Sequence, residues 1–310
     1  MSTLEPTLHY VSTGQNRRLA WWQWGAPEAP HLVVCVHGLT RQGRDFDVIA
    51  AALVARAQAQ GRAVRVVCPD VAGRGYSDSL PDPLAYQPAT YVADMLPVLA
   101  DLQQRAPIAA LDWIGTSMGG IMGMLIAAMP QDKLPAPVRR LVLNDVGPEL
   151  EWAALQRIGA YVGQVQTWDT PEQAAAALRV AHASFGPHSD AVWLELSRHC
   201  LRPTPDGRWR LHYDPAIAQA FASLGTPESN AKASAAMWHL YDRITARVLL
   251  LRGGDSDLLT RAAAQTMAER GPKATVVEFA GVGHAPTLIA PDQQRAVLDF
   301  LLPDPASAAA

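Results

Sequence analysis

The chain has 310 residues, of which 49% are hydrophobic and 18% are charged, and its formal net charge is −3. This length and apolar content suit one large α/β domain, or one domain with an inserted subdomain, around a substantial core. The slight acidic balance, with no basic run, argues against nucleic acid or an anionic membrane surface as the main partner.

Three further features of the sequence indicate the cellular compartment of the protein. The opening "MSTLEPTLHY" lacks the basic and apolar regions of a signal peptide, and no apolar stretch approaches the roughly 18 residues that span a bilayer. Cys35, Cys68 and Cys200 are odd in number and unrelated in spacing, which indicates buried thiols in a reducing compartment rather than a disulfide framework. A cytoplasmic protein without a membrane partner is expected.

Apolar runs alternate with helical patterns in the first half of the chain. The predicted strands are 31–38, 63–70, 108–115 and 139–145, and the predicted helices are 44–61, 91–105 and 118–129. Pro97 should kink the second of these helices or move its start. The alternation implies parallel strands with helices on both faces of the sheet.

The alternation stops between residues 148 and 245, where helical patterns dominate and no strand signal is convincing. It resumes with a strand at 246–254, a helix at 260–270, a strand at 274–280 and a helix at 291–302. The simplest division is an α/β core of residues 1–147 and 246–310 with a helical cap subdomain at 148–245. An all-helical second half with two stray strands is a less economical alternative.

The stretch "LDWIGTSMGG" places a serine between glycines where a predicted strand runs into a predicted helix. At so sharp a turn, side chains at 115 and 119 would collide with the neighbouring backbone, and glycines remove the collision. The hydroxyl is then presented at the carboxyl edge of the sheet, beside a helix N-terminus that favours negative charge. This is the Gly-x-Ser-x-Gly pattern of a nucleophile elbow, with Ser117 as the nucleophile.

A serine nucleophile needs a base and an acid that orients the base. His284 follows the last predicted strand and is the candidate base. In this class of sheet the acid lies between serine and histidine in the chain. Asp257, in the loop after strand 246–254, is preferred over Asp255 in the same loop and over Asp145, which we interpret as a capping or turn residue.

The oxyanion of a tetrahedral intermediate needs hydrogen-bond donors. We expect these to be the backbone N–H groups of Met118, which follows the serine, and of Leu39, in "VHGLTR" after strand 31–38. Gly38 would let that loop approach the substrate. His37, in the same loop, is interpreted as a structural hydrogen-bonding residue rather than as a base.

Together these motifs resemble the α/β-hydrolase superfamily. The likeness covers 31–147 and 246–302 and rests on "VHGLT", "PDVAGRGYSD", "GTSMGG", "LRGGDSDLL" and "GVGHAP", in the family's order. The resemblance implies an eight-stranded, mostly parallel sheet, a helical cap after the sixth strand, and acyl transfer through an acyl-enzyme without metal or organic cofactor. A serine at the elbow argues against the carboxylate-dependent dehalogenases and epoxide hydrolases of this superfamily.

The predicted cap holds five of the nine tryptophans, and its histidines lack metal-ligand spacing, so no zinc site is expected. The tryptophans either pack a small subdomain or line an apolar pocket over Ser117, and Trp152 and Trp238 are the candidates for the pocket. Arg41 either binds a substrate carboxylate or pairs with Asp45 one helical turn away, and the pairing is favoured.

These observations predict a serine esterase that acts on a small-molecule carboxylic ester or lactone. The same triad also serves hydrolysis of a carbon–carbon bond in a vinylogous diketone of the meta-cleavage type, and cofactor-free perhydrolysis. A ligand-binding protein that keeps the fold without catalysis is disfavoured by the intact Ser, Asp and His set. The sequence leaves the acyl group, the alcohol and the oligomeric state open.

Overall fold

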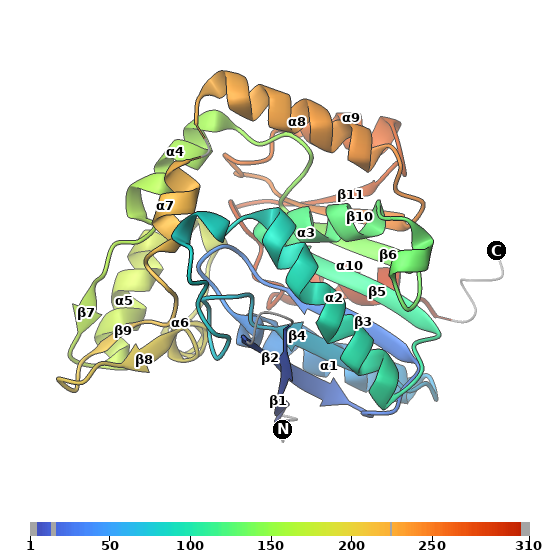
Figure 1. The fold of residues 1–310 in the computed structure, drawn as a ribbon, viewed down its shortest axis with the longest axis horizontal. Helices are drawn as coiled ribbons and strands as arrows, with labels where there is room; N and C mark the ends of the chain where they lie inside the picture. Colours follow the sequence, from blue (N-terminus) through green and yellow to red (C-terminus); the bar gives the residue numbers. More distant parts are fainter. Residues whose placement is uncertain (1–4, 14–16, 224, 305–310) are drawn as a thin grey trace.

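The computed structural model describes residues 5–13, 17–223 and 225–304. Its main sheet contains β1 (Thr7–Ser12), β2 (Arg18–Gly25), β3 (His31–Val36), β4 (Arg65–Pro69), β5 (Ala110–Thr116), β6 (Val138–Asn144), β10 (Arg247–Gly253) and β11 (Thr275–Phe279). The strand order is β1-β2-β4-β3-β5-β6-β10-β11 (Figure 1). Strand β2 is antiparallel to β1 and β4, and the remaining pairs are parallel. The predicted eight-stranded, mostly parallel sheet is therefore confirmed.

Helices cover both faces of this sheet. They are α1 (Asp47–Ala59), α2 (Pro88–Arg105), α3 (Met118–Ala127), α9 (Arg261–Glu269) and α10 (Pro291–Leu301), with short 3₁₀ helices η1 (Gly43–Phe46), η2 (Pro83–Ala85) and η3 (Gln131–Lys133). Helix α2 begins three residues before the predicted start, at a proline whose missing N–H needs no partner there. It then continues through Pro97.

The central strands are apolar throughout because both of their faces are buried. Along β3, Leu32 and Val34 pack with α2, α3 and α9 in one hydrophobic cluster, whereas Val33 and Cys35 pack with α1 and α10 in another. Side chains of a strand alternate between the two faces of its sheet, so one run of six buried residues serves both layers. The two layers hold the carboxyl ends of the strands, and the loops that follow them, in fixed positions.

Residues 148–245, which we call the cap segment, lie between β6 and β10. They form α4 (Trp152–Tyr161), β7 (Thr167–Trp168), α5 (Pro171–Ala181), η4 (Ala183–Phe185), α6 (Asp190–Arg198), β8 (Leu201–Pro203), β9 (Trp209–Leu211), α7 (Ile217–Ala222) and α8 (Pro227–Tyr241). The expectation of a segment without strands is wrong, because β7, β9 and β8 form a small antiparallel sheet. Strands of two or three residues are too short to show a period-two pattern.

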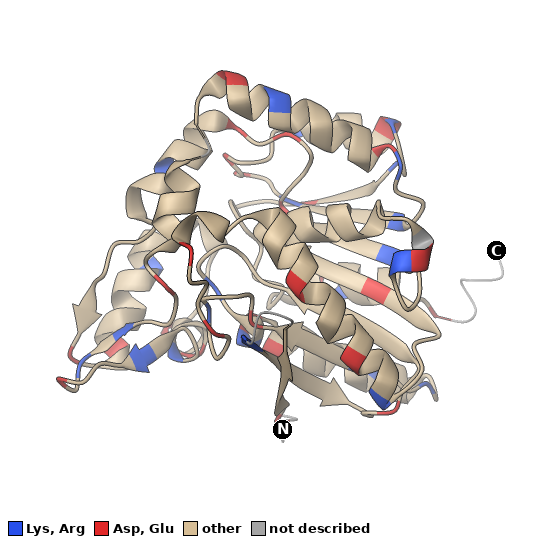
Figure 2. Cartoon of the chain, in the orientation of Figure 1, with Lys and Arg blue, Asp and Glu red and all other residues tan. Residues whose placement is uncertain are grey.

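Three further features concern the cysteines, the helices and the charges of the described chain. All three cysteines are buried free thiols. In the part of the chain that the structure describes, no helix is both long and apolar enough to cross a membrane. Acidic and basic positions are interspersed over the main sheet, its helices and the cap segment (Figure 2).

Candidate active site

Ser117 occupies the one-residue turn between β5 and α3, with a positive φ of 52°. The neighbouring glycines are required because the turn is so tight. A Cβ on Gly115 would lie 2.2 Å from the carbonyl oxygen of Gly119, and a Cβ on Gly119 would lie 2.0 Å from the carbonyl oxygen of Val36. The strained serine is therefore held by the close packing of β3, β5 and α3.

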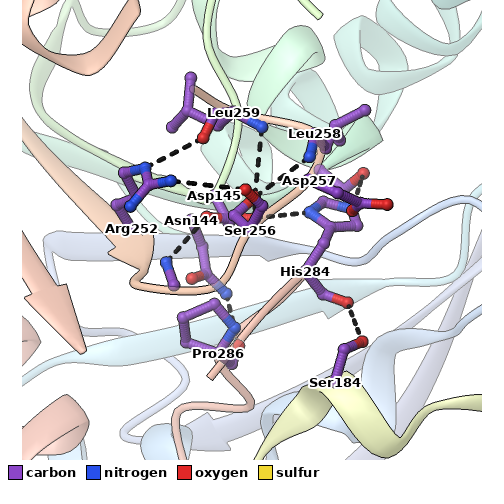
Figure 3. A network of polar contacts seen from close by, with 12 residues as sticks. Asn144, Asp145, Ser184, Arg252, Ser256, Asp257, Leu258, Leu259, His284 and Pro286 are labelled. Atoms are coloured by element: carbon purple, nitrogen blue, oxygen red, sulfur yellow. Dashed lines mark hydrogen bonds and ion pairs between the residues drawn. The ribbon is translucent and has the colours of Figure 1, made fainter. Parts of the chain in front are cut away.

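His284 lies in the loop after β11, and its Nε2 is 2.9 Å from Oγ of Ser117. Ser184, in η4 of the cap segment, forms two hydrogen bonds with this loop, and Figure 3 shows the one to His284. The Gly283 N–H donates to the Ser184 carbonyl at 2.6 Å, and the Ser184 hydroxyl donates to the His284 carbonyl at 3.0 Å. The structure thus brings together Ser117 and His284, which are 167 residues apart in the chain.

The acid that contacts His284 is Asp145, directly after β6. Its Oδ2 lies 2.8 Å from Nδ1 of His284, and its side chain is fully buried. The carboxylate also accepts a hydrogen bond from the Gly253 N–H at 2.8 Å and one from the Ser256 hydroxyl at 2.6 Å (Figure 3). An ionised carboxylate only accepts, so Nδ1 carries the proton and Nε2 is free to accept the proton of Ser117.

We expected Asp257 to orient the base, and this expectation is wrong because Asp145 occupies that position. Asp257 pairs instead with Arg157 of α4, at 2.7 and 2.9 Å, and both side chains are about half exposed. The contacts of the loop after β10 account for the difference: it presents Ser256 to the Asp145 carboxylate, whereas the Asp257 carboxylate pairs with the cap segment. The β10 loop contributes Ser256, which holds Asp145 in place.

The loop after β3 lies against the elbow. A Cβ on Gly38 would be 3.8 Å from Cβ of Ser117, which is an ordinary contact distance. Met118 is the first residue of α3, where helical N–H groups have no acceptor within the helix. Among the described residues, the N–H groups of Leu39 and Met118 donate no hydrogen bond. Both predicted oxyanion donors are therefore available.

Arg74, which was not among the expected site residues, contacts this loop and stabilises it. Its side chain is fully buried, its Nε donates to the Leu39 carbonyl at 2.8 Å, and its Nη2 lies 3.6 Å from the sulfur of Met118. The guanidinium also lies over the ring of Tyr91, at 4.8 Å. The sequence shows only an arginine in the turn-rich stretch "AGRGYSD", and its burial follows from the assembled fold.

His37 is structural, as interpreted from the sequence. Its Nε2 accepts a hydrogen bond from the Val71 N–H at 3.0 Å, and its Nδ1–H donates to the Gly38 carbonyl at 2.7 Å. Burial lowers the pKa of His37 to about 3, so the ring stays neutral and keeps both bonds. This residue ties the loop after β3 to the loop after β4.

Arg41 forms its hydrogen bonds with Asp45 and with the cap segment. Its guanidinium donates to both carboxylate oxygens of Asp45, at 2.6 and 2.8 Å, and to the Leu196 carbonyl in α6, at 2.9 Å. The structure thus supports the pairing with Asp45 rather than a substrate contact. Arg41 joins the loop after β3 to the cap segment.

The two candidate pocket tryptophans occupy packing positions. Trp152 is the first residue of α4 and is half-buried against the larger hydrophobic cluster. Trp238 of α8 donates from Nε1 to the Glu149 carboxylate at 3.3 Å, and the Arg270 guanidinium covers its ring at 4.6 Å. These contacts support the packing interpretation for both side chains.

Comparison with known proteins identifies the family of this chain. A model of the alpha/beta hydrolase family matches residues 33–300. A 3-hydroxybutyrate-oligomer hydrolase of Cupriavidus necator is 44% identical over 286 residues, which cover 91% of this chain and 92% of the relative. Esterase Rv0045c of Mycobacterium tuberculosis is 28% identical over 96% of this chain and 88% of its own length.

Among solved structures, an alpha/beta hydrolase from Novosphingobium aromaticivorans DSM 12444 superposes with a TM-score of 0.82. Its sequence is 34% identical, and the match covers 97% of this chain and 99% of that one. The family match spans most of the chain, and the two relatives are named as an oligomer hydrolase and an esterase. The chain therefore belongs to the α/β-hydrolase family and is a carboxylic ester hydrolase.

Proposed function

We propose that this hydrolase cleaves small carboxylic esters through a covalent acyl-enzyme on Ser117. The observation that carries the proposal is the unbroken relay from Asp145 to His284 to Ser117, with contacts of 2.8 and 2.9 Å. Such a relay activates a serine because the imidazole takes the hydroxyl proton while the carboxylate stabilises the imidazolium that forms. The N–H groups of Leu39 and Met118 lie at the same edge of the sheet and are proposed to hold the oxyanion.

Acylation begins when Oγ of Ser117 attacks the ester carbonyl carbon and passes its proton to Nε2 of His284. The carbonyl electron pair moves to oxygen and forms the tetrahedral oxyanion, which the two backbone N–H groups stabilise. When this intermediate collapses, the bond to the alcohol oxygen breaks, and that oxygen takes the proton from Nε2. The alcohol leaves and the acyl group stays on Ser117.

Deacylation repeats these steps with water. His284 accepts a proton from the water as its oxygen attacks the acyl carbon, and a second oxyanion forms in the same place. Collapse breaks the bond to Oγ, which recovers the proton from Nε2, and the carboxylic acid is released. Asp145 keeps its charge and holds the ring in one tautomer throughout.

The proposed substrates are short linear oligoesters of 3-hydroxybutyrate. The support is the 44% identity to a 3-hydroxybutyrate-oligomer hydrolase, which extends over nearly the whole of both chains. In such an oligomer each ester joins the carboxyl group of one unit to the hydroxyl group of the next. Every internal bond therefore offers the carbonyl and the alcohol leaving group that the mechanism needs.

A substrate panel tests this proposal. It contains the linear 3-hydroxybutyrate trimer, p-nitrophenyl butyrate, a medium-ring lactone and a vinylogous diketone of the meta-cleavage type. We expect both the trimer and the p-nitrophenyl ester to be cleaved. The value of kcat/KM for the trimer should be at least about 100-fold above that for the diketone, because a pocket that fits the oligoester chain should not fit the differently shaped diketone. Faster cleavage of the diketone than of every ester would contradict the proposal.

A further inference from the structure

A small cavity of about 150 Å³ lies away from the catalytic residues, between the turn that follows β4 and the small sheet of the cap segment. Its core side is formed by the turn at 73–79, which includes Ser77. Its cap side is formed by β8, β9 and the chain that follows them, with Arg202, Arg210, His212 and Asp214 in the lining. Nothing in the proposed mechanism uses these side chains.

Two arginines face each other in this cavity. Arg202 of β8 and Arg210 of β9 are direct partners in the antiparallel register, so their side chains share one face of the small sheet. Like charges in such positions destabilise a sheet. Neither guanidinium forms an ion pair or a hydrogen bond with any residue that the structure describes. By contrast, Arg208 in the turn of the same hairpin pairs with Asp206, at 3.0 Å.

The other charged and titratable groups in the lining do not neutralise this pair. Burial and the nearby Arg210 lower the pKa of His212, which keeps that ring neutral at pH 7. Asp214 is the one carboxylate among the lining residues, and its oxygens accept hydrogen bonds from the Tyr86 hydroxyl at 2.6 Å and the Ala216 N–H at 2.9 Å. Two guanidiniums against one engaged carboxylate leave the cavity positive and suited to an anion.

We propose that this cavity binds the terminal carboxylate of a linear hydroxy-acid oligoester whose scissile bond lies at Ser117. The inference rests on the proposed function, because every such oligomer ends in a free carboxylate. That carboxylate belongs to the alcohol side of the scissile bond and leaves with the first product. Arg202 and Arg210 are thus specificity residues that recognise the leaving part of the substrate.

The separation between β4 and β5 is compatible with this assignment. The turn follows β4, and β4 lies two places from the serine-bearing β5, which corresponds to roughly 10 Å across the sheet. One 3-hydroxy acid unit contributes four main-chain atoms, or roughly 5 Å when extended. A leaving part of two units is therefore about as long as the separation between these two strands. Arg74 connects the two places, because it belongs to this turn and its guanidinium reaches the Leu39 carbonyl.

The test compares Arg202→Gln and Arg210→Gln with the matched control Arg208→Gln, which lies in the same hairpin but outside the cavity lining. Two substrates are used: the linear 3-hydroxybutyrate trimer with its free carboxylate, and the methyl ester of the same trimer. We expect each cavity substitution to raise KM for the free acid at least about tenfold, because a charge-assisted hydrogen bond is lost. KM for the methyl ester and turnover of p-nitrophenyl butyrate should stay within about twofold of wild type.

The control should leave all three substrates unchanged. Equal effects on the acid and the methyl ester, or no effect on either, would overturn the carboxylate site while leaving the ester hydrolase proposal intact. If wild type cleaves p-nitrophenyl butyrate but not the trimer, the proposed substrate class fails. Titration calorimetry of folded Ser117→Ala then tests the cavity alone. Arg202-dependent binding of the trimer acid but not of its methyl ester supports the carboxylate site, and the absence of such binding overturns it.

Discussion

Ser117→Ala should lower kcat for p-nitrophenyl butyrate by at least about three orders of magnitude, and His284→Ala should do the same. The reason is that either change removes one end of the 2.9 Å contact through which the hydroxyl proton is transferred. The loss is expected in kcat rather than in KM, because the oxyanion loop and the substrate contacts remain. Steady-state kinetics with highly purified protein measures it.

Alanine at position 117 still has to adopt the positive φ of the elbow. Thermal unfolding followed by circular dichroism therefore accompanies the kinetics and shows that the variant is folded. The double variant should be no slower than either single variant, because the two residues act as one unit. Near-wild-type turnover by folded Ser117→Ala would refute the nucleophile.

Asp145→Asn should lower kcat by about four orders of magnitude, as expected when the group that fixes the tautomer of a catalytic histidine is lost. An asparagine that donates its N–H to Nδ1 of His284 forces the ring proton onto Nε2, where it can no longer accept from Ser117. The buried position of Asp145 lets no water take over the role. The measurement is kcat for the same p-nitrophenyl ester.

Asp257→Asn is the matched control, since both aspartates follow strands at the same edge of the sheet. It breaks an ion pair with Arg157 whose two side chains are about half exposed, and such pairs contribute at most about 1 kcal/mol. Turnover should stay within about fivefold of wild type. If Asp257→Asn were the crippling change and Asp145→Asn the mild one, the acid would have to be reassigned.

The positions of the proposed nucleophile and base were predictable because local rules determine them. Ser117 was identified from the glycines that its turn requires, and the close contacts at 115 and 119 show why no larger residue fits. His284 was identified from its position after the last strand. Both predictions need only the order of elements along the chain.

The acid was not predictable in the same way. Asp145 and Asp257 both follow strand ends and both lie between Ser117 and His284 in the chain. The choice depends on where each loop places its carboxylate relative to His284, and this placement is a property of the assembled fold. In that fold, Gly253 at the end of β10 and Ser256 in the loop after it hold the carboxylate of Asp145.

The cap segment shows a second limit. Its small sheet is built from strands of two or three residues, which leave no periodic signal but place Arg202 opposite Arg210. Ser184 and Arg41 also gain their contacts with the His284 loop and with α6 only when the segment folds onto the core. Long-range contacts of this kind cannot be obtained from local pattern.

The most direct test of the account is the site of covalent labelling by a fluorophosphonate, mapped by mass spectrometry of peptides from the native protein. The account predicts one label per chain, on Ser117, with labelling abolished in Ser117→Ala and slowed at least about 100-fold in Asp145→Asn. A label on another residue, or no label on folded wild-type protein, would contradict it.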